Sequence, residues 1–162
     1  MKCGVLTLSD KGSKGERVDT SGNFLVEFLK SQGWEVIKYQ ILPDEENLIV
    51  KCLKEWSDVL KLDVILTTGG TGVHPRDVTP EATKKILERE IPGIAEYIRF
   101  ISFSKTPLAA LSRALAGVRG NTLIINLPGS PKALKEILPS LVEIIYHGVS
   151  KIKGDSSECF RN

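Results

Sequence analysis

The sequence contains few cysteines and histidines and no long apolar run. Its three cysteines, Cys3, Cys52 and Cys159, lie far apart without a C-x-x-C pair, and there are only two histidines. This pattern argues against a structural zinc site and predicts reduced thiols in a cytoplasmic protein. No apolar run approaches the roughly 20 residues that cross a bilayer, and the N-terminus lacks the pattern of a signal peptide. We therefore expect no membrane partner.

The charges are almost balanced, with 22 Lys and Arg against 20 Asp and Glu and a net charge of +2. Such a balance, without a basic stripe that carries interleaved aromatics, argues against a nucleic-acid partner. Internal repeats and low-complexity linkers are also absent. At 162 residues and 41% hydrophobic content, the chain can bury one core. We expect a single domain over residues 1–150 and a polar C-terminal tail over residues 151–162.

The most informative stretch is Asp63–Asp77, with the sequence DVILTTGGTGVHPRD. Three glycines in four residues, Gly69, Gly70 and Gly72, free the backbone from Cβ clashes, so its N–H groups can turn toward a phosphate. The stretch lacks the lysine of a P-loop and the third glycine of a dinucleotide fingerprint. It is therefore either a different phosphate-binding loop or a tight turn between a strand and a helix.

The residues after the glycines favour a binding site. Thr79 and Pro80 are typical of a helix start, with Thr79 as the N-cap, which leaves Asp77 outside the helix. A carboxylate beside a glycine loop suits phosphate chemistry, because it can hold the Mg²⁺ that binds phosphate. A solvated loop acid is the alternative interpretation of Asp77.

Alternating strands and helices are predicted along the chain. Apolar and β-branched runs predict strands and a hairpin over Lys2–Leu8, Trp34–Leu42, Val64–Leu66, and Leu115–Arg119 paired with Thr122–Leu127. Apolar positions at helical spacing predict helices over Thr20–Ser31, Glu45–Leu60, Pro80–Glu90, Gly93–Phe103, Pro107–Ala116 and Lys132–Ile145, the last restarted at Pro139. The alternation indicates an α/β fold with a largely parallel sheet and right-handed crossovers.

Four loops are expected at one edge of this sheet, because parallel strands end on the same side. They begin at Ser9, Pro43, Gly69 and Pro128, and ligands of open α/β sheets bind at this edge. Two of the loops lead into helix N-termini, which present free N–H groups to an anion. The arrangement predicts a site that binds a polyphosphate together with a metal ion. Asp44 lies in the second loop, where its position before a helix favours an N-cap.

Five motifs carry a resemblance that runs from the first predicted strand to the last predicted helix, essentially the whole chain except the tail. They are Leu8–Gly22 (LSDKGSKGERVDTSG), Thr68–Gly72 (TGGTG), Arg76–Thr83 (RDVTPEAT), Leu111–Ala114 (LSRA) and Asn126–Pro131 (NLPGSP). They resemble the molybdenum cofactor biosynthesis family, and most closely its MogA branch. The resemblance implies a three-layer α/β/α sandwich with a mostly parallel, mixed sheet, assembled as a homotrimer. It also implies transfer of AMP from Mg·ATP to molybdopterin, with other enzymes of that biosynthesis as partners.

The resemblance assigns roles to individual residues. It gives catalysis and Mg²⁺ binding to Asp44 and Asp77, which replaces the N-cap interpretation of Asp44. It gives substrate and nucleotide binding to a wider set: Ser9, Asp10, Thr68, Gly69, Gly70, Thr71, Gly72, Ser112, Arg113, Gly129 and Ser130. In the implied mechanism the attacking phosphate is already ionised, so neither His74 nor His147 is needed as a base. Arg113 would offset charge on the leaving group.

Three other interpretations stay open from the sequence. A sibling MoaB type shares the fold, although the stretch Lys11–Arg17 favours the MogA side. A molybdopterin-binding or carrier module would bind without turnover, but two retained acids favour catalysis, because cations bind a polyanion better. A third interpretation is a nucleotide-binding protein unrelated to pterins, but it gives no function to the second anion-binding loop, at Gly129 and Ser130. Finally, the apolar segment 91–118 is either core or a subunit contact.

Overall fold

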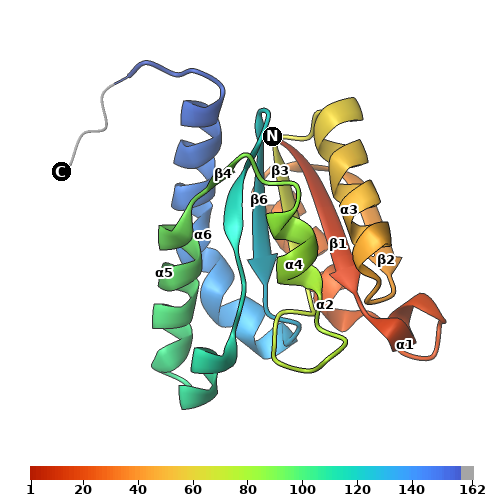
Figure 1. The fold of residues 1–162 in the computed structure, drawn as a ribbon. Coiled ribbons are helices and arrows are strands. Elements are labelled where there is room, and N and C mark those ends of the chain that lie inside the picture. Colours follow the sequence, from red (N-terminus) through yellow and green to blue (C-terminus); the bar gives the residue numbers. More distant parts are fainter. Residues whose placement is uncertain (158–162) are drawn as a thin grey trace.

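The computed structural model describes residues 1–157; Cys159 and the rest of the expected tail after residue 157 lie outside the described residues. Figure 1 shows one sheet with helices on both of its faces. Six strands form this sheet in the order β2-β1-β3-β6-β5-β4. Their bounds are β1 Lys2–Leu8, β2 Glu35–Leu42, β3 Val64–Thr68, β4 Arg89–Glu90, β5 Ala116–Arg119 and β6 Thr122–Leu127.

The strands pair in two ways. β2, β1, β3 and β6 run parallel to one another, whereas β5 is antiparallel to β6 and β4 is antiparallel to β5. β5 and β6 form the predicted hairpin, and Gly120 in its turn has a φ of +53°, which favours glycine. The predicted mostly parallel, mixed sheet is therefore confirmed.

Helices cover both faces of the sheet. Their bounds are α1 Asp10–Ser13, α2 Thr20–Ser31, α3 Glu46–Lys54 followed by a π-helix at Glu55–Val59, α4 Thr79–Lys84, α5 Pro92–Phe103, a 3-10 helix at Pro107–Leu111, and α6 Pro131–Ile152. One core lies between the sheet and α2, α5 and α6, with Leu66 of β3 and Leu141 among its buried residues. The other lies between the sheet and α3, the π-helix and α4, and contains Ile65 and Leu53. The three-layer α/β/α sandwich is confirmed.

The helix predicted over Pro80–Glu90 is too long. α4 ends at Lys84, and the N–H groups of Glu88 and Ile91 donate to carbonyl oxygens of β5. The residues between them, Arg89–Glu90, therefore pair with β5 as the edge strand β4. A helical pattern in the sequence is overridden here by sheet pairing across a long sequence separation.

The helix predicted over Pro107–Ala116 is wrong in its second half. Only Pro107–Leu111 is helical, and Ser112 after it adopts an extended conformation. The cause is a contact that the local sequence does not show: the N–H of Arg113 donates to the carbonyl oxygen of Thr71 at 2.9 Å. This bond draws the segment against the glycine loop, so it continues as a loop instead of a helix.

The last helix is longer than predicted. α6 passes through Pro139 without a restart and ends at Ile152, so the expected domain boundary at residue 150 falls inside it. Leu138 and Leu141 are buried on either side of the proline, and this packing offsets the cost of the lost hydrogen bond. Within residues 1–157, no helix has the length and apolar character needed to cross a membrane.

Candidate active site

The loops that follow β1, β2, β3 and β6 lie at one edge of the sheet, because these four strands are parallel (Figure 1). β2 lies on one side of β1 and β3 on the other, so the chain reverses its direction of winding between β1 and β3. Ligands of open α/β sheets bind at such a reversal. A cavity of about 150 Å³ opens at this point, and Leu8, Thr68 and Gly129 are among its lining residues.

The glycine loop needs glycine at two consecutive positions. Gly69 has a φ of +97°, and a Cβ there would lie 2.3 Å from the carbonyl oxygen of Leu8. Gly70 has a φ of +64°, and a Cβ there would lie 2.3 Å from the hydroxyl of Thr79 and 2.8 Å from Oδ1 of Asp44. The loop can therefore approach β1 and the acid only because both side chains are absent.

Asp44 is not a helix cap. The N-cap of α3 is Glu45, whose side chain makes no capping bond, so the N-cap interpretation of Asp44 from spacing is wrong. Oδ2 of Asp44 accepts the N–H of Asp10 at 3.1 Å, whereas Oδ1 is buried and has no hydrogen-bond partner in the described structure. Burial raises the pKa of this carboxyl, and the nearby charges of Asp10 and Asp77 raise it further.

Asp77 lies on the other side of the same loop. Its Oδ2 accepts the N–H of His74 at 2.9 Å, and a Cβ on Gly72 would lie 2.9 Å from that oxygen. Asp77 makes no capping bond to α4, whose N-cap is Val78 and not Thr79 as predicted. Instead, the hydroxyl of Thr79 donates to the carbonyl oxygen of Gly69 at 2.9 Å, which ties the helix start to the glycine loop.

The two acids suit a hard divalent cation that the substrate helps to bind. Mg²⁺ is usually held by one or two carboxylates together with phosphate oxygens and water. The unpartnered Oδ1 of Asp44 and the neighbouring carboxylate of Asp77 provide such oxygen ligands. Within residues 1–157, no group of three or more His, Cys, Asp or Glu side chains is placed so as to hold a metal ion.

The guanidinium of Arg113 is held by other residues of the protein and does not point freely into the site. Its Nε donates to the carbonyl oxygen of Gly72 and its Nη2 to the carbonyl oxygen of Asp77, both at 2.6 Å. Its Nη1 pairs with Glu81. Arg113 therefore closes the loop between Gly72 and Asp77 and fixes its shape. Ser112 lines a separate cavity of about 240 Å³ beside Gly72.

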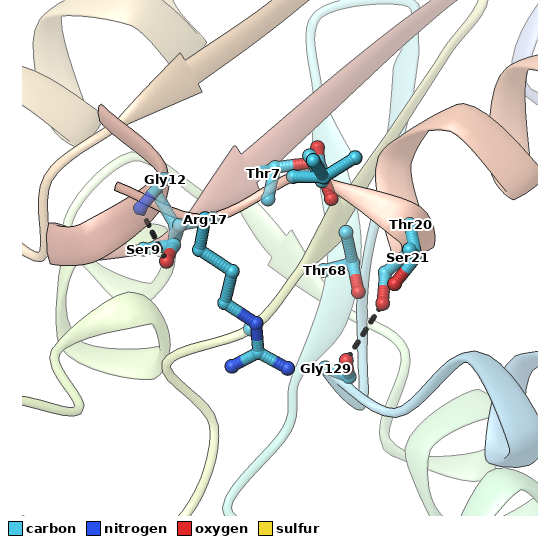
Figure 2. A pocket seen from close by; sticks show the side chains of 12 residues that line it. Thr7, Ser9, Gly12, Arg17, Thr20, Ser21, Thr68 and Gly129 are labelled. Carbon is cyan, nitrogen blue, oxygen red and sulfur yellow. Dashed lines mark hydrogen bonds between the residues drawn. The ribbon is translucent and has the colours of Figure 1, made fainter. Parts of the chain in front are cut away.

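The cavity at the strand ends is lined largely by hydroxyl and backbone groups, which Figure 2 shows together. Ser9, Thr68, Gly69 and Gly129, which the sequence analysis gave a binding role, are among the residues that line this cavity. Ser130 is not among the lining residues: its side chain caps α6 by accepting the N–H of Ala133.

Several residues of this cavity were not named from the sequence. They are Thr7, Gly12, Arg17, Val18, Asp19, Thr20 and Ser21 together with Leu8. Ser21 donates to the carbonyl oxygen of Gly129 at 2.7 Å, and Figure 2 shows the guanidinium of Arg17 reaching toward Gly129. Most of them fall within the motif Leu8–Gly22. The motif therefore pointed to the right segment, but it did not indicate which of its residues line the cavity.

Comparison with known proteins places the chain in a family. The family described as "Probable molybdopterin binding domain" matches residues 4–147. The chain belongs to this family. Among its relatives, the molybdopterin adenylyltransferase of Helicobacter pylori strain J99 is 43% identical over 154 residues, which cover 94% of this chain and 88% of that protein. The molybdopterin adenylyltransferase of Escherichia coli K12 is 37% identical over 92% of this chain and 80% of that protein.

Other members of the molybdopterin-binding family are larger or have known structures. The molybdenum cofactor synthesis protein cinnamon of Drosophila melanogaster is 47% identical over 95% of this chain, but the chain spans only 26% of that protein. The structure of MoaB from Thermus thermophilus is similar with a TM-score of 0.88, 51% identity and coverage of 95% and 97% of the two chains. A MogA structure has a TM-score of 0.89 and 35% identity, over 94% of this chain and 99% of that one.

Proposed function

We propose that the chain is a molybdopterin adenylyltransferase. It transfers AMP from ATP to molybdopterin: an oxygen of the terminal phosphate of molybdopterin bonds to the α-phosphorus, and the bond from that phosphorus to the pyrophosphate oxygen breaks. The observation that carries this proposal is the pair of carboxylates at the glycine loop, with Oδ1 of Asp44 buried and unpartnered among the described residues beside Asp77. Relatives of similar length that carry this name support it.

Asp44 and Asp77 are the residues that would hold Mg²⁺ on the triphosphate. The cation would offset the negative charge that gathers as two phosphates approach each other. The raised pKa of Asp44 is consistent with this role, because a cation would remove the cost of a buried, unpaired carboxylate. Its buried Oδ1 faces the glycine loop, so a phosphate bound there would lie next to both acids.

The anionic parts of the substrates would be bound by groups at the strand ends. The backbone of the glycine loop and the N-terminus of α6, which begins at Pro131 after the Ser130 cap, present N–H groups to phosphate oxygens. Arg17 adds a positive charge at the cavity, where Figure 2 shows its guanidinium reaching toward Gly129. These groups position the reactants, which is the main requirement of phosphoryl-type transfer.

The proposed chemistry needs no general base. The attacking phosphate is already ionised at neutral pH, so no proton has to leave it before attack. Consistent with this, the ring Nδ1 of His74 accepts the N–H of Arg76 at 3.1 Å and so helps to shape the loop. Arg113 is likewise bound to Gly72 and Asp77, which makes it a residue that positions the loop and not the counter-charge of the leaving group.

We also propose that the protein assembles as a homotrimer in the cytoplasm, where it works beside other enzymes of molybdenum cofactor biosynthesis. Large apolar side chains are exposed on α5 and the 3-10 helix, among them Phe100, Phe103 and Leu108. A grouping of this kind is typical of a subunit contact. The free, buried thiols of Cys3 and Cys52, whose pKa values are raised to about 12 by burial, suit a reducing compartment.

The proposal is tested by identifying the product. The purified protein is incubated with molybdopterin, ATP and Mg²⁺, and the pterin fraction is analysed by mass spectrometry. We expect a pterin that carries AMP, formed only when all three components are present. Molybdopterin that is bound without any adenylylated product would contradict the proposal and would favour a carrier module.

A further inference from the structure

Arg76 binds two acidic residues from other parts of the site. Its Nε donates to Oδ2 of Asp10 at 3.0 Å and its Nη2 donates to Oδ1 of Asp10 at 2.8 Å, which is the parallel arrangement of a bidentate pair. The same Nη2 contacts Oε1 of Glu45 at 2.9 Å. Arg76 lies on the loop that carries Asp77, so these bonds join that loop to the segments after β1 and β2.

Asp10 is in turn bonded to Asp44 in both directions. The N–H of Asp10 donates to Oδ2 of Asp44, and the N–H of Asp44 donates to Oδ1 of Asp10, both at 3.1 Å. A continuous chain of contacts therefore runs from Asp77 through its neighbour Arg76 and through Asp10 to Asp44. Both carboxylate oxygens of Asp10 have partners, whereas one oxygen of Asp44 has none in the described structure.

We infer that Arg76 and Asp10 form a positioning pair that fixes Asp77 relative to Asp44, and that Asp10 is a support and not a substrate or metal ligand. The inference rests on the proposed function, in which those two acids hold Mg²⁺. It changes the role that the family resemblance gave to Asp10. Residues that do not touch the metal but hydrogen-bond to its ligands orient those ligands. Their removal typically lowers metal affinity by about 10–100-fold.

A second pair in the same molecule provides a matched control. Arg119 donates from Nε and Nη2 to the two carboxylate oxygens of Asp58, at 2.9 Å and 2.7 Å. This pair has the same bidentate form, but Arg119 lies at the hairpin turn, away from the acids of the glycine loop. Because exposed ion pairs contribute little to stability and Arg76 and Asp10 are both partly exposed, we expect removal of Arg76 to change the melting temperature only slightly. Arg119 is more buried and also donates from Nη1 to the carbonyl oxygen of Ile86 at 3.1 Å, so thermal unfolding is used to check that the control variant is folded.

The experiment measures binding of α,β-methylene-ATP by calorimetry, with Mg²⁺ and with a chelator, for the wild type, Arg76→Gln, Arg76→Lys and Arg119→Gln. For each protein, the affinity with Mg²⁺ is divided by the affinity with the chelator. This ratio reports how well Asp44 and Asp77 hold the cation, and its measurement needs no turnover. We expect Arg76→Gln to reduce this ratio by about tenfold. Lysine carries the charge but cannot form the two parallel bonds, so Arg76→Lys should restore only part of the ratio. Arg119→Gln should match the wild type.

Three results would overturn the positioning role. The first is a wild-type ratio in Arg76→Gln, and the second is a wild type whose binding does not depend on Mg²⁺. The third is full recovery in Arg76→Lys, which would show that charge alone matters. Failure of the proposed function is distinguishable: a wild type that binds the analogue with Mg²⁺ but forms no adenylylated molybdopterin would contradict the activity, while a reduced ratio in Arg76→Gln would still support the positioning role.

Discussion

Asp44 is the residue at which stability and function are most clearly opposed. Its carboxyl is half-buried, and one oxygen has no partner among the described residues. A group like this costs stability when it is ionised and unpaired, and such groups are retained where they bind a ligand. Neither the burial nor the missing partner could be predicted from sequence, because both depend on contacts with residues from the glycine loop and from the segment after β1.

We predict that Asp44→Asn stabilises the metal-free protein at pH 7. Because the folded-state pKa of Asp44 is raised, ionisation at neutral pH destabilises the fold, and this cost disappears as the pH falls through that pKa toward the ordinary value of 3.8. The melting temperature of the variant should exceed that of the wild type at pH 7, and the difference should shrink as the pH falls toward 4. Thermal unfolding at several pH values measures it.

The same variant should lose its response to ligand. Mg²⁺ together with ATP should raise the melting temperature of the wild type, because only the folded state binds them, and should raise that of Asp44→Asn much less. A variant that is less stable than the wild type at pH 7, or equally stabilised by Mg·ATP, would contradict the role given to Asp44. Asp58→Asn, at an exposed acid paired with Arg119, serves as the control.

At the scale of elements, the sequence predicted the strands better than the helix ends. β1 was predicted with its full bounds, and β6 and the hairpin turn at Gly120 were also correct, because their apolar runs are short and bounded by polar or turn residues. The ends of α4 and of the 3-10 helix at Pro107–Leu111 were missed. In both places a backbone hydrogen bond to a distant segment, and not a local signal, redirects the chain after the helix.

α6 shows how packing decides an element against local propensity. It crosses Pro139 because its apolar face is buried along the sheet, with Leu141 fully buried. We predict that Leu141→Ala lowers the free energy of unfolding by roughly 2–5 kcal/mol, the usual cost of such a cavity. Tyr146→Ala, on the exposed side of the same helix, should change it by less than about 1 kcal/mol. Denaturant unfolding measures both, and equal effects would contradict this packing.

At the scale of the whole molecule, the exposed apolar side chains of α5 and of the 3-10 helix after it are the feature that the monomer does not explain. Phe100 is 73% exposed and Leu108 is 68% exposed. The sequence showed that segment 91–118 is apolar but could not show which of its side chains the core would leave uncovered. Three of the apolar residues of α5, Ile94, Ala95 and Ile98, are buried, so the segment serves both as core and as exposed surface.

We predict that Phe100→Glu converts the proposed trimer to monomer. The substitution places a charge on the proposed contact without touching the buried side of α5, so the fold should persist. Light scattering coupled to size-exclusion chromatography measures the mass, and circular dichroism checks the fold. The exposed Tyr146→Ala on α6 should stay trimeric. A wild type that is monomeric at micromolar concentration, or a trimer that persists in Phe100→Glu, would contradict the proposed interface.

The site as a whole combines four loops that are far apart in sequence and meet only because their strands are parallel. That meeting was predictable from the alternation of strands and helices, whereas the contribution of Arg17 and the binding of Arg76 to Asp10 were not. Those contacts depend on how the long loop between β1 and α2 and the loop between β3 and α4 pack together, which no periodic pattern encodes.

The most direct test of the central claim is pyrophosphate release from Mg·ATP, measured with and without molybdopterin for the wild type and Asp77→Ala. Asp58→Asn is the control for a surface acid away from the site. We predict release that requires molybdopterin in the wild type and in Asp58→Asn, and a rate lower by about a hundredfold or more in Asp77→Ala. Release at the wild-type rate from a folded Asp77→Ala protein, or no release from the wild type with molybdopterin, would contradict the account.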